Sequence, residues 1–93
     1  MNTKAKGSRN ERRTIQVLEA AGYRCTKSGA SLGAWDVIGI RSFDFVLVQC
    51  KTNAWPSPAE IETLEDFPAP VNCFKLVHRW DDRKRKPRVK EIK

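Results

Sequence analysis

Three polar side chains stand at the ends of two apolar stretches, where charged and amide groups are unusual. Asp36 lies in the first stretch, and Gln49 and Lys51 lie two residues apart in the second. Side chains alternate across a strand, so Gln49 and Lys51 share one face and Cys50 points to the other. If the two stretches form a hairpin around residues 42–44, an acid, an amide oxygen and an ammonium converge. Each residue alone has an ordinary structural interpretation, and their conjunction favours a functional site.

Glu11 is a second acid that could lie beside Asp36, Gln49 and Lys51. It shares one face of the expected first helix with Ile15 and Leu18, so it lies on the apolar stripe. A carboxylate placed there needs a cation, a hydrogen-bond donor or a capping role. One alternative is a capping box with Ser8, three residues earlier. The other is that the helix carries Glu11 over Asp36, and the sequence leaves both open.

The elements that must position these residues follow from helix and strand signals. The pattern predicts two helices, the second with Pro58 near its first turn, and five strands joined by short loops. A helix, three strands, a helix and two strands imply an α/β fold with a mixed sheet and helices packed on it. One domain over residues 1–93 is expected, with a frayed basic start at 1–7. The helices are expected at 9–21 and 59–67, and the strands at 23–27, 35–41, 45–51, 72–80 and 88–92.

Charge is segregated along the 93 residues, which carry a net charge of +7. Residues 1–13 hold five positive charges and one negative, and residues 83–93 hold seven and one, whereas residues 14–82 hold six and nine. Basic ends attract polyanions by counterion release, so nucleic acid is the expected partner. A solubilising tail is the alternative. A membrane-surface role is not expected, because RKRKPRVK has no amphipathic helical face.

Other chemistries have little support in the composition. The three cysteines are odd in number and never spaced as C-x-x-C, so neither a disulfide framework nor a zinc site is indicated. A single histidine leaves little room for histidine-based acid and base catalysis. No apolar run approaches the roughly 18 to 20 residues of a membrane span, and the N-terminus lacks a secretory signal. We therefore expect a soluble, intracellular (cytoplasmic) protein.

In their order along the chain, these motifs resemble the PD-(D/E)XK nuclease superfamily. Glu11 in a first helix is followed by the loop SGASLG, by WDV with Asp36, and by VQCK with Gln49 and Lys51. Within the superfamily, the likeness is to archaeal-type Holliday-junction resolvases and their phage and bacterial relatives, over residues 7–80. Trp35 stands where these proteins usually have proline. Gln49 stands where they normally have Asp or Glu, which lowers the number of acids from three to two.

The resemblance implies a restriction-endonuclease-like αβββαβ core and a Mg²⁺-dependent, structure-selective endonuclease, a Holliday-junction resolvase of DNA recombination and repair. Mn²⁺ is expected to substitute for Mg²⁺. Asp36 would be the principal ligand, Glu11 and the Gln49 oxygen would assist, and the Cys50 backbone carbonyl would contribute. Lys51 would orient the attacking water or stabilise the transition state. The substitution at Gln49 leaves open a non-catalytic DNA-binding module with a degenerate nuclease fold.

The expected partners are branched or duplex DNA and a second copy of the chain, since a resolvase makes two symmetry-related cuts. Backbone contacts carry no sequence code, so shape recognition is expected. Lys27 and Ser28 in the loop would touch a phosphate, with an ordinary surface turn as the alternative. The remaining DNA-binding candidates are Lys4, Lys6, Arg9, Arg12, Arg13, Arg83, Lys84, Arg85, Lys86 and Arg88.

Overall fold

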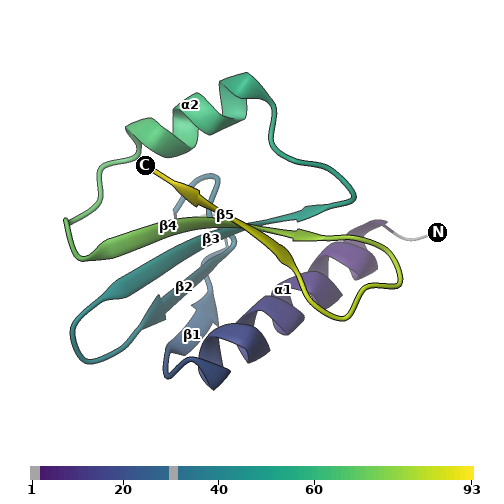
Figure 1. Cartoon of the computed structure of the whole chain (residues 1–93), viewed down its shortest axis with the longest axis horizontal. Coiled ribbons are helices and arrows are strands. Elements are labelled where there is room, and N and C mark those ends of the chain that lie inside the picture. Colours follow the sequence, from purple (N-terminus) through teal and green to yellow (C-terminus); the bar gives the residue numbers. More distant parts are fainter. Residues whose placement is uncertain (1–2, 30–31) are drawn as a thin grey trace.

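The computed structural model describes residues 3–29 and 32–93, with side chains from residue 6 onward. Its centre is one five-stranded sheet in which the strands follow chain order (Figure 1). Neighbouring strands are antiparallel except for the third and fourth, which are parallel. The sheet is therefore mixed, as predicted. Its strands are β1 (Arg24–Lys27), β2 (Val37–Ile40), β3 (Phe45–Thr52), β4 (Cys73–Trp80) and β5 (Arg88–Ile92).

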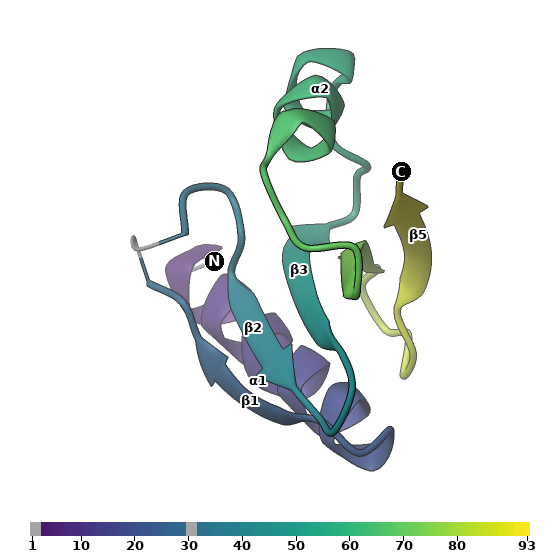
Figure 2. The ribbon, with the colours of Figure 1, turned by 90° about the vertical axis from the view of Figure 1, so that its left-hand side faces the viewer.

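Two helices cover opposite faces of the sheet (Figures 1 and 2). Helix α1 (Thr3–Ala20) packs on one face, and helix α2 (Pro58–Asp66), which connects the two parallel strands, lies on the other. Alternation along β3 explains the two cores, because Val48 belongs to the cluster under α1 and Leu47 to the cluster under α2. Neither helix, within the part of the chain that is described, has the length and apolar character that a membrane crossing requires.

The predicted start of the first helix is wrong. Helix α1 begins at Thr3 instead of residue 9, so residues 3–7 are helical rather than a frayed tail. Lysine and alanine in this segment are good helix formers and carry the helix through Gly7. Ser8 consequently lies inside the helix, so of the two alternatives for Glu11 the capping box with Ser8 is wrong, because a cap must precede the helical residues. The Ser8 hydroxyl instead accepts a hydrogen bond from the Lys27 ammonium at 3.0 Å.

The other predicted elements agree with the structure to within two residues, and their order is confirmed. Helix α2 does begin with a capping box, in which Ser57 and Glu60 each bond the backbone N–H of the other, and Pro58 follows the cap. Strand β2 begins two residues later than predicted. The reason is that the Trp35 N–H closes a turn onto the Leu32 carbonyl, so regular pairing starts only after it.

Candidate active site

Asp36 is fixed to the end of strand β3 by two hydrogen bonds. Its backbone N–H donates to the Val48 carbonyl at 2.9 Å, and its carboxylate Oδ2 accepts the Cys50 backbone N–H at 2.8 Å. The pairing of Val37 with Val48 sets this register and places Asp36 beside Gln49. The predicted hairpin is therefore confirmed, and it brings the acid to the Gln49–Lys51 segment.

Gln49 and Cys50 point to opposite faces of the sheet, as predicted from strand alternation. The Cys50 thiol lies 3.3 Å from the Thr14 hydroxyl on the α1 side, and Leu47, two residues before Gln49, packs on the α2 side. Gln49 is only 8% exposed, and its Oε1 has no hydrogen-bond partner among the described residues. A buried carbonyl oxygen without a partner is costly. This oxygen is thus available to a group other than the protein itself.

Glu11 approaches the Asp36 carboxylate from helix α1. Its carboxylate is partly exposed, and Oε1 lies 3.7 Å from the Lys27 ammonium, which in turn reaches from the end of β1. Burial raises the pKa of Asp36, and the negative charge of Glu11 raises it further. The Cys50 N–H and the positive charge of Lys51 act in the opposite direction. Glu11 and Lys51 therefore both act on the charge of Asp36, and Lys27 pairs with Glu11 beside it.

Lys51 has a carboxylate partner that sequence reasoning missed. Its ammonium lies 3.1 Å from Oε2 of Glu60, and Oε1 of the same side chain accepts the Ser57 N–H at 2.9 Å. The Ser57 N–H, followed by Lys51, holds the pKa of Glu60 below its ordinary value. The S-P-A-E sequence of the cap was the available signal, but nothing in it shows that α2 packs beside Lys51.

A buried polar network supports the strand segment from the α1 side. The Thr14 hydroxyl accepts the Trp80 indole N–H at 2.8 Å and contacts the Cys50 thiol and, at 3.1 Å, the His78 Nδ1. With the indole and the thiol as donors, the hydroxyl proton goes to Nδ1, which assigns the His78 proton to Nε2. One turn earlier in the helix, the Asn10 amide donates to the Thr52 hydroxyl at 2.9 Å. These bonds attach α1 to strand β3 at Cys50 and at Thr52, the residues immediately before and after Lys51.

Burial keeps the titratable members of this network neutral. It lowers the pKa of His78 to about 4 and raises the pKa of the Cys50 thiol to about 12. His78 therefore packs as a neutral ring with Trp80, and Cys50 remains a thiol. Their side chains act as structural groups, and the three cysteines are free.

The loop before Asp36 is tied to it through the backbone. The Ser28 N–H donates to the Asp36 carbonyl at 3.0 Å, and the Ser28 hydroxyl bonds the Trp35 carbonyl. Lys27 contacts both Ser8 and Glu11. The structure thus gives Ser28 a local partner beside the site and leaves its predicted phosphate contact as a prediction.

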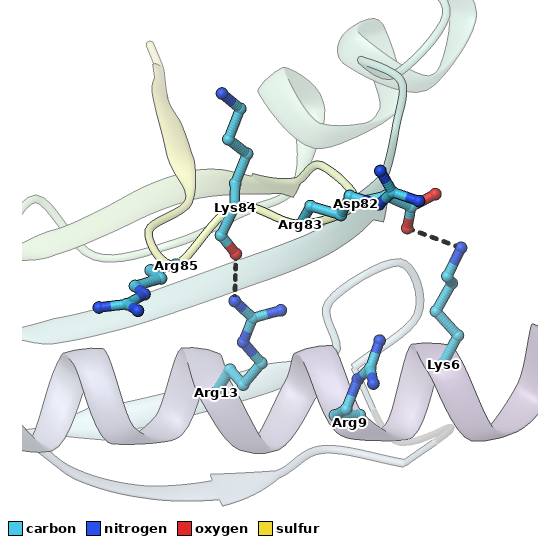
Figure 3. A pocket seen from close by; sticks show the side chains of 7 residues that line it. All are labelled: Lys6, Arg9, Arg13, Asp82, Arg83, Lys84 and Arg85. Carbon is cyan, nitrogen blue, oxygen red and sulfur yellow. Dashed lines mark hydrogen bonds and ion pairs between the residues drawn. The ribbon is translucent and has the colours of Figure 1, made fainter.

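The predicted DNA-binding residues fall into separate groups. Six of them gather around one groove of about 710 Å³ (Figure 3). Arg12 and Lys86 are exposed outside it, Arg88 lies over the Trp55 ring at 5.6 Å, and the side chain of Lys4 lies outside the described residues. The six that line the groove are Lys6, Arg9, Arg13, Arg83, Lys84 and Arg85.

The mixed sheet with a helix on each face, and the acid and lysine at the end of its β2–β3 hairpin, define the fold of the PD-(D/E)XK nuclease class. A family model described as archaeal Holliday junction resolvase (hjc) matches residues 2–66, which is more than half of the chain. The chain belongs to that family.

The solved structures and the curated proteins give different results. Hjc of Archaeoglobus fulgidus, a Holliday junction resolvase from an archaeal hyperthermophile, superposes with a TM-score of 0.73 and 21% identity. The match covers 94% of this chain and 73% of that chain. At this identity the likeness shows the fold. No curated protein matches the chain.

The oxygen donors around Asp36 fit a divalent cation, although they carry fewer negative charges than three carboxylates would. Among the described residues, no group of three or more His, Cys, Asp or Glu side chains forms a metal site. Asp36 and Glu11 supply two carboxylates, and the unpartnered Gln49 oxygen is a neutral donor of the kind that Mg²⁺ accepts. Burial, followed by the negative charge of Glu11, raises the pKa of Asp36, and a bound cation would favour the charged form of this carboxyl.

Proposed function

We propose that this chain is a metal-dependent endonuclease that hydrolyses phosphodiester bonds in branched DNA, with the Holliday junction as its substrate. The observation that carries the proposal is the Asp36 carboxylate held by the Cys50 N–H beside Gln49 and Lys51, in a member of the archaeal Holliday junction resolvase family. Glu11 and Lys51 both act on the Asp36 charge, which supports their place in the same centre.

The chain's own groups would divide the work of the reaction. Asp36, Glu11, the Gln49 oxygen and the Cys50 carbonyl would hold Mg²⁺, or Mn²⁺ in its place. When bound, such an ion lowers the pKa of a coordinated water and offsets the charge that develops on the phosphate. Lys51 would donate to a phosphate oxygen or orient the attacking water. The Cys50 N–H keeps the Asp36 carboxylate in one orientation throughout.

One observation favours a second function, a DNA-binding module that does not cut. Gln49 leaves only two carboxylates at the centre, which weakens its attraction for a cation. The basic residues would still bind DNA through its phosphates in such a protein. Both functions require DNA binding, and only the first includes cleavage.

Cleavage of a labelled four-way junction, beside a linear duplex of the same sequence, separates these functions. We expect cleavage of the junction with Mg²⁺ or Mn²⁺ and none with a chelator. Tight junction binding without cleavage in either metal would support the binding module instead. Cleavage that persists in the chelator would contradict the proposed role of the metal.

We further propose that the active species is a homodimer, because a junction requires one cut in each of two symmetry-related strands. Light scattering is expected to give twice the 10.6 kDa of one chain. Mapping of the cuts is expected to show paired nicks on opposite strands. A 10.6 kDa species that leaves one unpaired nick would contradict the dimer.

A further inference from the structure

A basic groove lies between helix α1 and the turn that joins β4 to β5. Figure 3 shows Arg9 pointing from the helix toward this turn, between the contacts of Lys6 and Arg13. The groove has a volume of about 710 Å³, and its lining contains six cationic side chains and a single carboxylate, Asp82. Its charge is therefore complementary to a polyanion.

The groove and Glu11, the residue that α1 contributes to the catalytic centre, lie on opposite flanks of helix α1. Lys6, Arg9 and Arg13 recur every three or four residues and share one flank. Glu11 is two residues from Arg9 and from Arg13, which places it about 160° around the helix from both. It contacts Lys27 of β1, at the other side of the helix. A phosphate in the groove is therefore a different phosphate from the one at Asp36.

The groove is held in shape by contacts that do not involve a ligand. The Asn53 amide donates to Asp82 at 2.9 Å, and the Asp82 N–H donates to the Asn53 side-chain oxygen at 2.8 Å. Lys6 pairs with the same carboxylate at 2.8 Å, while Arg13 stacks over the Trp80 ring at 4.1 Å. Arg13 also donates to the Lys84 carbonyl. The turn is thus fixed both to α1 and to the end of β3, two residues beyond Lys51.

These contacts leave uncompensated cations at the surface. Asp82 is neutralised by Lys6, and Arg9 and Arg83 are exposed and form no ion pair among the described residues. Arg83 also has a φ of 66°, a conformation that costs energy for an arginine and here sets the course of the turn. Guanidinium groups bind phosphate oxygens in a bidentate manner, so two of them in one groove suit a phosphodiester backbone.

We propose that this groove binds the backbone of a second duplex arm of branched DNA and thereby makes the chain prefer a junction to a linear duplex. The proposal rests on the proposed function for the identity of the substrate. A strand beside Glu11 and a strand in the groove are separated by helix α1, whose diameter with side chains is about 10–12 Å. Two arms that diverge from a branch point can occupy both flanks at once.

Binding of the double variant Arg9→Ala/Arg83→Ala to DNA tests this directly. Arg24→Ala/Lys90→Ala is the matched control, because both residues are exposed on strands outside the groove and the loss of charge is the same. Affinities for a four-way junction and a linear duplex are measured in a chelator, so that cleavage does not interfere. Thermal unfolding verifies that both variants are folded.

The groove variant is expected to lose about 10- to 100-fold in junction affinity and less than about threefold in duplex affinity. The slope of log affinity against log salt concentration for the junction is expected to become shallower, by the equivalent of about two released counterions. The control is expected to retain the preference of the wild-type chain for the junction. Inorganic phosphate at millimolar concentration is expected to leave junction binding unchanged.

Three results would overturn the proposal. Equal losses on junction and duplex would show one duplex lying across both flanks. Equal behaviour of the groove and control variants would show a general charge effect, and displacement of DNA by millimolar phosphate would show a site for a free anion. Because the measurement needs no cleavage, a wild-type chain that fails to cut would refute the proposed nuclease function while leaving this test intact.

Discussion

The ammonium of Lys51 lies 3.1 Å from Oε2 of Glu60, the same side chain that caps helix α2 by accepting the Ser57 N–H. The first turn of α2 therefore restrains the lysine of the candidate centre. Both side chains are partly exposed, so the pair contributes little to the free energy of unfolding. Its value lies in limiting the positions that the ammonium can occupy.

The substitution Glu60→Gln is expected to lower the single-turnover cleavage rate about three- to tenfold, because Lys51 loses its charged partner while the amide oxygen still serves the cap. The Kd for DNA and the free energy of unfolding are expected to change little. Glu62→Gln, at an exposed position of the same helix, is the control. A rate equal to or above that of the wild-type chain would show that Glu60 does not position Lys51 for the reaction.

Removal of the Lys51 ammonium has a larger expected effect. Lys51→Ala is expected to reduce the chemical step by about 10² to 10⁴, the range for a group that acts in the transition state. Combining it with Glu60→Gln is expected to add no further loss, since Glu60 acts through Lys51. Lys93→Ala is a control for the loss of one positive charge. An unchanged single-turnover rate in Lys51→Ala would show that Lys51 is a surface residue with no part in the reaction.

The Gln49→Glu substitution restores a third carboxylate and is expected to tighten Mg²⁺ binding about tenfold in titration calorimetry. Because position 49 is buried, the new charge is also expected to lower the Tm in a chelator and to make Mg²⁺ raise the Tm more than it does in the wild-type chain. Gln16→Glu adds the same charge at an exposed position of α1. Weaker or unchanged Mg²⁺ binding would show that residue 49 does not face the metal.

Neutral burial of His78 predicts a loss of stability in mild acid. Its pKa is about 4 in the fold, whereas an unfolded histidine titrates near 6.5, so the unfolded chain takes up a proton between these values. Stability therefore falls as the pH is lowered through this range, by about 2 kcal/mol between pH 7 and pH 5. The raised pKa of Asp36 has the opposite effect, because protonation of this carboxyl in acid favours the folded state. The free energy of unfolding in urea is therefore measured in the variant Asp36→Asn, which lacks this contribution.

The chain has one histidine, so its protonation can be followed without ambiguity. The imidazole resonance in NMR spectra is expected to stay constant from pH 7.5 to pH 5. An imidazole that titrates near 6.5 in the folded chain would contradict the buried neutral ring.

The part of the site that the sequence predicts is the part built from local rules. Alternation along β3 places Gln49 and Lys51 on one face, and the short turn between β2 and β3 fixes the register that brings Asp36 to them. The fold class followed from the same element order. Helix α1 carries Glu11 to the acid, although the capping signal at Ser8 pointed to a different start for the helix.

Tertiary packing supplies what sequence patterns do not contain. Glu60 reaches Lys51 only because α2 crosses the face of the sheet between two parallel strands. The count of basic residues at the chain ends gives their number but not their positions. Only the packing of the β4–β5 turn against α1 shows that Arg9 and Arg83 share a groove turned away from Glu11.

Asp36 is the residue on which the proposed active site depends most, and one substitution at this position preserves the hydrogen bond that holds its side chain. In Asp36→Asn the side-chain oxygen can still accept the Cys50 N–H, while the charge that would hold the metal is lost. We predict that this variant binds a four-way junction with nearly the wild-type affinity and does not cut it in Mg²⁺, whereas Asp66→Asn on the exposed end of α2 cuts normally. Cleavage by Asp36→Asn at the wild-type rate would contradict the assignment of the active site.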